Sequence, residues 1–500
     1  MNASYDVVVV GGGSAGCVIA SRLSEDPARR VLLLERGPDP QPVPEIVANA
    51  SERLRVLAET PYVVTYPTKR GADGSIFYPL AGRILGGGSS VNIMAGNRAP
   101  ARDFGRWARE AGKSWAWDHI LPVFKRIEHD ADFGETEFHG GSGPVWVERR
   151  GKIADYTGWE RAFIDACVSL GYPASDDLNV PSPYGVVSIP WTIKDGKRQS
   201  AAVAYIGPAR GRKNLTIIDE ATVMAVELAG DRAAGVRYAR GGAVHRVAAG
   251  EVVLSAGVYH TPQILMLSGI GPVDELRRLG IRVNVALPGV GENLQDHTSV
   301  FLSFEWRSEE SVDWPGRGEF LLAKSDKARE QFDLHVIIRA PIAVEGSRKV
   351  GPIAVFLLEQ RSRGRVTLAS TDPSALPVIE PRQLENKEDL VAMVRGMKLV
   401  ERIAQAKPLE PYYGKMIAPA PDEAWGDYAR RTYDSYHHGS GTCKMGRVDD
   451  PMAVVDEQLS VRGVRNLLVA DASIMPTLVR ANTNLTVMMI AERCSDFLRG

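Results

Sequence analysis

The stretch that decides the fold runs from Asp6 to Glu35 and reads DVVVVGGGSAGCVIASRLSEDPARRVLLLE. Its four consecutive valines predict a buried parallel strand, because β-branched side chains suit a sheet that is covered on both faces. Helical spacing over residues 15–24 and a second apolar run over residues 31–34 complete the beginning of a β-α-β unit. These residues therefore indicate an α/β protein with a Rossmann-like nucleotide-binding domain.

Three glycines between the strand and the helix, Gly11, Gly13 and Gly16, follow the pattern GxGxxG, and Glu35 stands nineteen residues after the last of them. In a dinucleotide site the first glycine permits the tight turn, the second lets the backbone approach the pyrophosphate, and the third allows close helix–strand packing. The helix N-terminus favours the pyrophosphate charge, and Glu35 suits the ribose hydroxyls. A turn without a ligand uses the same glycines, and the motif does not distinguish FAD from NAD, but the context favours a dinucleotide.

Composition excludes several classes of protein. Of 500 residues, 44% are hydrophobic and 24% are charged, which is typical of globular proteins and excludes disordered and fibrous chains. The 60 basic and 61 acidic residues leave a net charge of −1, so nucleic acid is not an expected partner. No apolar run approaches the ~20 residues that a membrane span requires. The first residues lack an export signal, and the four scattered cysteines form no metal-binding or redox pattern, so we expect a cytoplasmic protein without a metal site.

Three later segments carry further chemistry. Residues 82–92, GRILGGGSSVN, form a loop of amide donors that suits a phosphate or a flat ring, although a flexible connection has the same composition. Residues 436–443, YHHGSGTC, place histidine on a glycine-rich turn, where it has few packing neighbours; a structural histidine is the alternative. Residues 481–486, ANTNLT, lead into the last helix, where Asn484 suits the N-cap position.

Together and in this order, these segments resemble the glucose–methanol–choline (GMC) family of flavin oxidoreductases. The resemblance covers residues 5 to about 497 and includes the segments 255–272, 289–297 and 469–476. Within the family, the chain is most similar to bacterial 5-hydroxymethylfurfural and aryl-alcohol oxidases, and less so to choline dehydrogenases.

The resemblance implies an FAD-binding domain assembled from residues 1–150, 208–297 and 440–500. An antiparallel-sheet substrate domain, residues 151–207 and 298–439, is inserted between these segments. The sequence pattern agrees with this arrangement. Its expected elements are strands in 214–226, 251–255, 332–337, 365–368 and 466–470, helices from 261, over 388–406 and over 484–498, and an irregular excursion over 38–80.

The resemblance also implies a role for individual residues. His438 matches the family's catalytic histidine, and Asn482 matches its partner. The residues implied in FAD binding are Gly11, Gly13, Ser14, Ala15, Gly16, Glu35, Arg36, Arg83, Gly86, Gly87, Gly88, Ser89, Asn92, Ile93, Met94, Ala95, Val223, Ala256, Asp471, Ala472, Asn482 and Thr483. His437 and Arg480 are candidates for the substrate pocket, where Arg480 would favour an acidic substrate; a structural arginine is the alternative. Family members that attach FAD covalently carry a histidine where this chain has Val91, which implies non-covalent FAD.

The expected function is FAD-dependent oxidation of a primary alcohol, aryl, furanic or similar, to the aldehyde. His438 would act as general base, Asn482 would position the hydroxyl, and the flavin N5 would accept the hydride, with oxygen or another acceptor taking the electrons. The alternatives are a choline-type dehydrogenase, an FAD-containing lyase with no net redox, and, with less support, a light-driven decarboxylase, an NAD-dependent dehydrogenase or a binding module.

Overall fold

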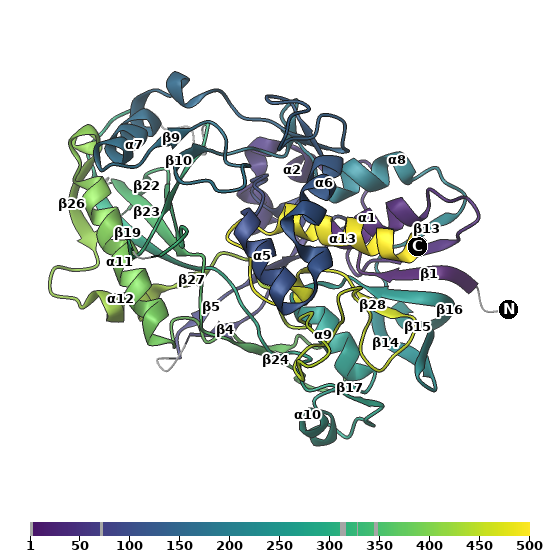
Figure 1. Cartoon of the computed structure of the whole chain (residues 1–500). Helices are drawn as coiled ribbons and strands as arrows, with labels where there is room; N and C mark the ends of the chain where they lie inside the picture. The colour runs from purple at the N-terminus through teal and green to yellow at the C-terminus, as the bar shows by residue number, and fades with distance from the viewer. Residues whose placement is uncertain (1–3, 71–73, 311–316, 328, 345–348) are drawn as a thin grey trace.

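The computed structural model describes residues 4–70, 74–310, 317–327, 329–344 and 349–500. The expectation that the chain lacks an export signal depends partly on residues 1–3, which lie outside the described residues. The chain forms two lobes, each built around one large sheet (Figure 1). The strand order is β13-β2-β1-β16-β15-β14 in the first sheet, with β28 beside β16. In the second sheet the order is β26-β19-β23-β21-β20-β10-β9, with β22 beside β23 and β27 beside β19. This mixed α/β architecture confirms the predicted fold class.

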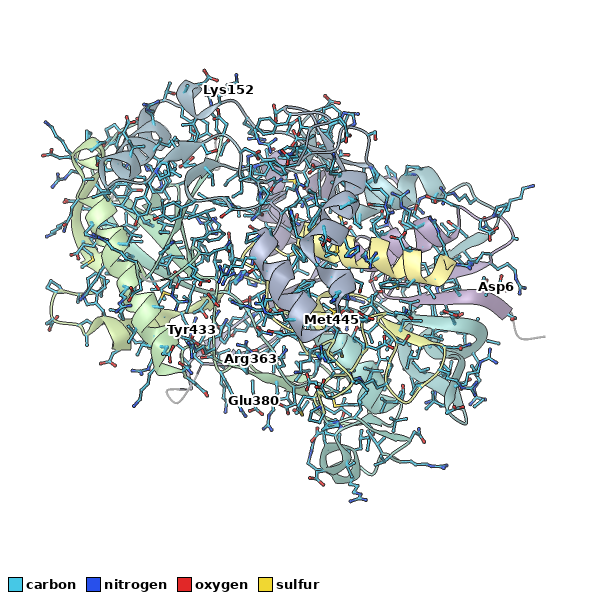
Figure 2. All side chains as sticks on the ribbon, viewed as in Figure 1. Asp6, Lys152, Arg363, Glu380, Tyr433 and Met445 are labelled. Atoms are coloured by element: carbon cyan, nitrogen blue, oxygen red, sulfur yellow. The ribbon has the colours of Figure 1, made fainter. Side chains whose placement is uncertain are left out.

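The first sheet holds its parallel strands side by side, so that their carboxyl ends meet at one edge. Its strands are β1 (Ser4–Val10), β2 (Val31–Leu34), β13 (Leu215–Ile218), β14 (Thr222–Ala229), β15 (Arg232–Arg240), β16 (Ala243–Leu254) and β28 (Leu467–Val469). The helices α1 (Ser14–Leu23) and α13 (Asn484–Arg499) run together over this sheet (Figure 1). β1 begins near Asp6 at the outer end of this lobe (Figure 2).

The second sheet is almost entirely antiparallel and buries both faces. Its strands are β9 (Ala174–Ser175), β10 (Gly185–Ser188), β19 (Thr298–Trp306), β20 (Glu319–Ala323), β21 (Leu334–Ile338), β22 (Ile342–Ala343), β23 (Lys349–Leu357), β26 (Tyr413–Ala418) and β27 (Asp434–Ser435). One face packs against α7 (Gly158–Ser169), α11 (Lys387–Ala404) and α12 (Trp425–Thr432). The opposite face carries Phe320 and Phe356 and packs against Met94 and Tyr436. This second face forms the roof of the site described below.

The remaining elements lie outside the two large sheets. They are α2 (Glu45–Ala48), α3 (Arg55–Glu59), β3 (Val63–Thr65), β4 (Thr68–Lys69), β5 (Ile76–Phe77), β6 (Leu80–Gly82), α4 (Gly88–Val91), α5 (Ala101–Glu110), α6 (Trp117–Ile127), β7 (Glu128–Asp130), β8 (Val145–Val147), β11 (Ile193–Lys194), β12 (Lys197–Arg198), α8 (Gly207–Ala209), α9 (Gly257–Leu267), β17 (Ile270–Gly271), α10 (Val273–Arg278), β18 (Val285–Ala286), β24 (Arg365–Thr367) and β25 (Val378–Glu380). No helix in the described ranges is long and apolar enough to cross a membrane.

The strands of each sheet lie within the segments expected for the corresponding domain, and we keep that division as a proposal. Three expectations differ from the structure. The helix expected from residue 261 is α9, which begins four residues earlier, at Gly257. The strand expected at 365–368 is β24, which pairs only with β25 in a separate ribbon. The excursion over 38–80 is not wholly irregular, because its described residues form two short helices and short strands before β6 begins.

Candidate functional site

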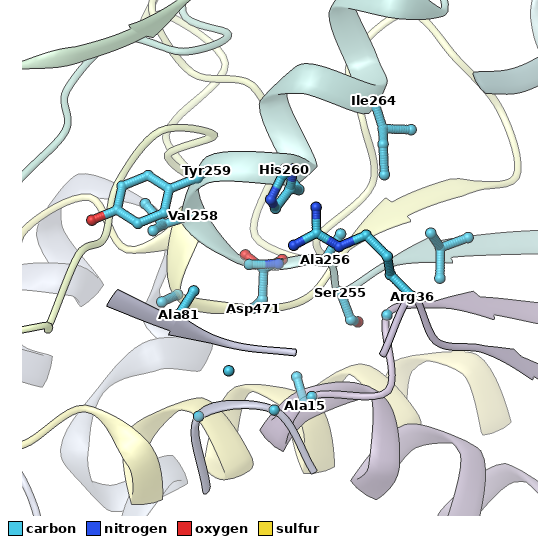
Figure 3. A pocket seen from close by; sticks show the side chains of 18 of the residues that line it. Ala15, Arg36, Ala81, Ser255, Ala256, Val258, Tyr259, His260, Ile264 and Asp471 are labelled. Carbon is cyan, nitrogen blue, oxygen red and sulfur yellow. The ribbon is translucent and has the colours of Figure 1, made fainter. Parts of the chain in front are cut away.

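The first of two adjoining cavities lies at the carboxyl ends of the parallel strands, and we call it the strand-end cavity. It is lined by Gly11 after β1, Glu35 after β2, Ser255 after β16 and Asp471 after β28. Figure 3 shows the start of α1 at Ala15 on one side and α9 on the other, with Asp471 between them. This is the edge of an open α/β sheet at which ligands bind. The cavity has an empty volume of about 1360 Å³.

The three fingerprint glycines have separate geometric roles. A Cβ on Gly16 would lie 1.8 Å from the carbonyl oxygen of Gly11, so the first turn of α1 packs too closely for any side chain. Gly11 has a φ of +98°, and its Cβ would lie 2.4 Å from the carbonyl oxygen of Ser255. A Cβ on Gly13 would meet nothing within 4 Å, and this residue lines the cavity. The backbone is therefore open to a ligand at Gly13, as a bound pyrophosphate requires.

Two buried carboxylates stand at opposite ends of this arrangement. The two oxygens of Glu35 accept hydrogen bonds from the backbone nitrogens of Gly12 (2.7 Å) and Gly37 (2.6 Å). One oxygen of Asp471 accepts from the backbone nitrogen of Gly257 (2.9 Å) and the other from that of Ser473 (2.7 Å). Burial raises the pKa of both carboxyl groups. Backbone donors thus fix both side chains in place before any ligand binds.

The far end of the strand-end cavity carries aromatic and basic groups. The side chain of Arg36 extends from the end of β2 towards His260 (Figure 3). His260 Nε2 lies 2.7 Å from the Tyr66 hydroxyl, and its Nδ1 lies 2.6 Å from Gln263 Oε1. Burial lowers the pKa of His260 to about 3, so this imidazole is neutral. An end lined by aromatic rings, with one guanidinium beside them, suits a nucleobase, and the cavity as a whole fits an extended dinucleotide.

The second cavity lies between the lobes, and we call it the inter-lobe cavity. It shares the residues Ser14, Leu80, Ala81, Gly82, Gly88, His437, Thr483 and Val487 with the strand-end cavity, so the two adjoin. The second sheet contributes Ser299, Phe301 and Phe356 as its roof. His438 and Asn482 lie in its wall. A ligand that extends from the first cavity into the second therefore presents its far end to these two residues.

His438 is held through its backbone and both ring nitrogens. Its backbone nitrogen donates to Asp296 Oδ1 (2.9 Å), and the Ser435 hydroxyl donates to Asp296 Oδ2. Its Nε2 lies 3.1 Å from Asn482 Nδ2, and its Nδ1 lies 2.9 Å from His297 Nδ1. With the Asn482 amide so oriented, its nitrogen can only donate, which assigns the His438 proton to Nδ1, where it is donated to His297. The lone pair on Nε2 then faces Asn482 and the cavity.

The electrostatic surroundings keep this imidazole uncharged. Burial, followed by the neighbouring His297, His437 and His335, holds the pKa of His438 well below its usual value. Burial likewise lowers the pKa of His297 to about 3. Burial raises the pKa of Asp296 to about 7, partly offset by the hydrogen bonds from Ser435 and His438. His438 is therefore a neutral base, a state that can accept a proton from a ligand hydroxyl.

The structure gathers most of the expected site residues in the two cavities. Those that line at least one of them are Gly11, Gly13, Ser14, Ala15, Glu35, Arg36, Gly87, Gly88, Asn92, Ile93, Met94, Ala95, Val223, Ala256, His437, His438, Asp471, Ala472, Asn482 and Thr483.

Four expected FAD-binding residues line neither cavity. Gly16 packs inside the turn, as described above. Arg83 is exposed to solvent, and its backbone nitrogen donates to Tyr62. Gly86 donates its backbone N–H to the carbonyl of Gly12 (2.7 Å) and accepts from the hydroxyl of Ser89 (2.6 Å). Gly86 and Ser89 therefore shape the loop that carries the cavity wall.

The expectation for Arg480 needs a correction. Its guanidinium donates to Asp103 and, over 2.7 Å, to Glu359, and its backbone nitrogen donates to Asp103 Oδ2 (2.7 Å). It lines neither cavity. Two carboxylates behind the site attract this cation away from the pocket, so Arg480 is a structural residue.

Two residues of the site were missed by sequence reasoning. His297, which contacts the catalytic candidate His438, ends the segment 289–297 that entered only as a family element. Arg339 lines the inter-lobe cavity from the residue after β21. Side chains alternate between the two faces of a strand, so His335, Ile337 and Arg339 share one face. This alternation is the feature of the sequence that could have indicated Arg339.

The chain is similar to known proteins over nearly its whole length. Family models described as GMC oxidoreductase match residues 5–299 and residues 360–491. The chain is 37% identical to the mitochondrial choline dehydrogenase of Homo sapiens, with 99% of this chain and 90% of the relative covered. It is 36% identical to the choline oxidase of Arthrobacter globiformis, with coverages of 99% and 94%. The crystal structure of pyridoxine 4-oxidase from Mesorbium loti matches with a TM-score of 0.92 and 30% identity over 99% of each chain.

Proposed function

Because the chain belongs to the GMC oxidoreductase family, whose members bind FAD and oxidise alcohols, we propose that it oxidises a primary alcohol to the aldehyde with His438 as general base. The observation that carries this proposal is the approach of His438 Nε2 to Asn482 Nδ2, 3.1 Å apart, in the wall of a cavity that adjoins a dinucleotide cradle. When bound, FAD supplies the hydride acceptor that no protein side chain provides.

The two side chains divide the work on the substrate hydroxyl. His438 Nε2 takes the hydroxyl proton, a contribution of roughly 10²–10⁴ in rate for a well-placed base. Asn482 Nδ2 donates a hydrogen bond to the same oxygen and holds it as negative charge develops there. His438 is buried, and the low dielectric of a buried site strengthens both interactions.

The walls of the inter-lobe cavity support an alcohol on an aromatic or furan ring. Phe301, Phe356 and Tyr436 present apolar surface beside His438, and the Tyr436 ring centroid lies 4.3 Å from that of His438. A choline-type dehydrogenase is the second candidate, and the sequence relatives favour it at least as strongly, because those named above are a choline dehydrogenase and a choline oxidase. We also propose that FAD is held without a covalent bond, since Val91 offers no nucleophile in the cavity wall.

The test is anaerobic mixing of the FAD-loaded protein with a panel of benzylic, furanic, aliphatic and quaternary-ammonium alcohols. We expect at least one of them to bleach the flavin absorbance, and readmitted air or an added acceptor then identifies the electron acceptor. In the variant His438→Ala we expect bleaching to slow by roughly 10²–10⁴. FAD should still bind, because His438 does not line the strand-end cavity.

Two outcomes would contradict the proposal. A protein that holds FAD but bleaches with no alcohol would point to a lyase that uses the same base without net redox. Bleaching at a near-normal rate in His438→Ala would remove the base from the assignment.

A further inference from the structure

Arg339 extends from the second sheet over the inter-lobe cavity. It follows β21, and its backbone nitrogen donates to the carbonyl of Pro352 (3.1 Å), which continues the pairing with β23 one residue beyond the strand. The alternation along β21 places Arg339 on the same face as His335 and Ile337, which is the face turned towards the first lobe. The strand therefore fixes the base of this side chain.

The surroundings of Arg339 connect it to the catalytic candidate. Tyr436 stacks on Phe356 with 3.9 Å between ring centroids, and its centroid lies 4.3 Å from that of His438. Burial lowers the pKa of Arg339, and the Tyr436 hydroxyl acts against this. A guanidinium nevertheless stays charged at neutral pH. One aromatic ring thus separates a cation from the proposed base.

Arg339 is the arginine among the described residues that line this cavity. Among the described residues that line it, Arg339 and Asp434 are the two with a charge at neutral pH, since burial lowers the pKa of His437 and His438. The carboxylate of Asp434 accepts from the backbone nitrogen of Ser435 (2.8 Å) and lies near His437. Arg339 therefore places a guanidinium in the cavity wall beside Phe356.

We propose that Arg339 binds a carboxylate on the substrate and so determines which alcohols are oxidised. The inference rests on the proposed alcohol oxidation at His438. The planar fork of a guanidinium matches the two oxygens of a carboxylate, and the low dielectric of a buried cavity strengthens this pairing. The same guanidinium repels a trimethylammonium group, because both carry a positive charge. The substrate class is therefore an alcohol with an anionic group, which sets this chain apart from relatives named for choline.

The first test uses the wild-type holoenzyme and four alcohols that share one ring and one hydroxymethyl group. They are benzyl alcohol, 4-(hydroxymethyl)benzoate, its methyl ester, and 4-(hydroxymethyl)benzyltrimethylammonium; the ester controls for electron withdrawal by the ring substituent. The quantity compared is the second-order rate constant for anaerobic flavin reduction. We expect this constant to be about tenfold higher for the carboxylate than for the neutral alcohols, and lowest for the ammonium. Equal values across the series, or a preference for the ammonium, would overturn the inference without any variant.

The second test replaces the cation. In Arg339→Gln we expect the dissociation constant of 4-methylbenzoate, an unreactive carboxylate measured through its perturbation of the flavin absorbance, to rise about 30-fold. We expect kcat/KM for 4-(hydroxymethyl)benzoate to fall about tenfold relative to that for benzyl alcohol, and Arg339→Lys to restore part of the affinity for the carboxylate. The control is Arg361→Gln, which removes an exposed ion pair with Glu388 on the same lobe.

The outcomes separate the two proposals. If no alcohol reduces the flavin, the proposed function fails. If benzyl alcohol reduces it but Arg339→Gln leaves the ratio of carboxylate to neutral substrate unchanged, only the role of Arg339 fails.

Discussion

At the scale of single residues, His297 accepts the proton on Nδ1 of His438 and so keeps the His438 Nε2 without a proton. Its Nδ1 lies 2.9 Å from His438 Nδ1, and it lines neither cavity, so we regard it as a positioning residue. In His297→Asn the amide oxygen can still accept the Nδ1 proton, whereas the side chain in His297→Leu cannot. We expect His297→Leu to lower kcat by about tenfold, with KM nearly unchanged and a shifted pH profile of flavin reduction, because a wrongly tautomerised imidazole presents N–H to the substrate.

The comparison between the two variants makes this test specific. A purely structural role would damage His297→Asn and His297→Leu alike and would lower the retained FAD in both. Retention of full activity and an unaltered pH profile in His297→Leu would show that His438 keeps its tautomer without this contact.

Residues near a recognisable motif could be predicted from the sequence, whereas residues that reach the site from elsewhere could not. His438 and Asn482 lie in glycine-rich and asparagine-rich turns, and the structure brings them to within hydrogen-bond distance. Arg480 stands two residues from Asn482, yet it pairs with Asp103, which is distant in the sequence. Arg339 reaches the cavity because β21 lies in the sheet above it, and only the pairing of strands reveals that position.

At the scale of elements, helix α9 shows why a boundary was misplaced. The sequence pattern predicts a helix from residue 261. The helix begins at Gly257, so Pro262 lies inside it and cannot donate to the carbonyl of Val258. The hydroxyl of Thr442 donates to that carbonyl instead (2.6 Å). A residue of the histidine motif thus completes a helix in another segment, which local sequence cannot indicate.

The turn between β1 and α1 supports a prediction that separates folding from cofactor binding. In Gly16→Ala the new methyl group would collide with the Gly11 carbonyl oxygen, so we expect the protein without FAD to lose about 1–3 kcal/mol of stability. In Gly13→Ala the methyl group meets no protein atom and stands where the cavity is open. We therefore expect the stability of the FAD-free protein to be unchanged and FAD to bind more weakly.

Thermal unfolding of FAD-free protein and the flavin retained after gel filtration measure these two effects. Equal losses of stability in both variants, or full flavin retention in Gly13→Ala, would contradict the separate roles assigned to the two glycines.

At the scale of the whole molecule, an ion cluster around His139 joins segments assigned to different domains. His139 Nδ1 lies 3.0 Å from Asp130, and its Nε2 lies 3.0 Å from Asp177, beyond the expected boundary at residue 150. Arg98 pairs with Glu128 (3.0 Å) in the same cluster. Glu128, Asp130 and His139 are close enough to hold a metal ion. Arg98, Arg149, which lies 2.9 Å from Asp130, and a charged His139 account for this grouping of acids, and we propose an ion-pair cluster at this position.

The cluster makes the stability of the protein depend on pH in a stated direction. Burial acts to lower the pKa of His139, but the hydrogen bonds to Asp130, Asp177 and Glu128 outweigh it and raise the pKa to about 10. A histidine whose pKa is raised in the folded state contributes stability that is fully present below its unfolded pKa of about 6.5 and is lost as the pH rises through 10. We expect His139→Gln to lower the stability by about 3 kcal/mol at pH 6, because it removes one of the cations that balance the buried carboxylates, and by progressively less towards pH 10. Apparent melting temperatures of the two proteins, compared from pH 6 to pH 10 at one scan rate, measure this difference, and His245→Gln, on an exposed strand position, is the matched control. A gap between His139→Gln and wild type that stays constant or widens as the pH rises would show that His139 is neutral in the folded protein and that Arg98 and Arg149 balance the acids.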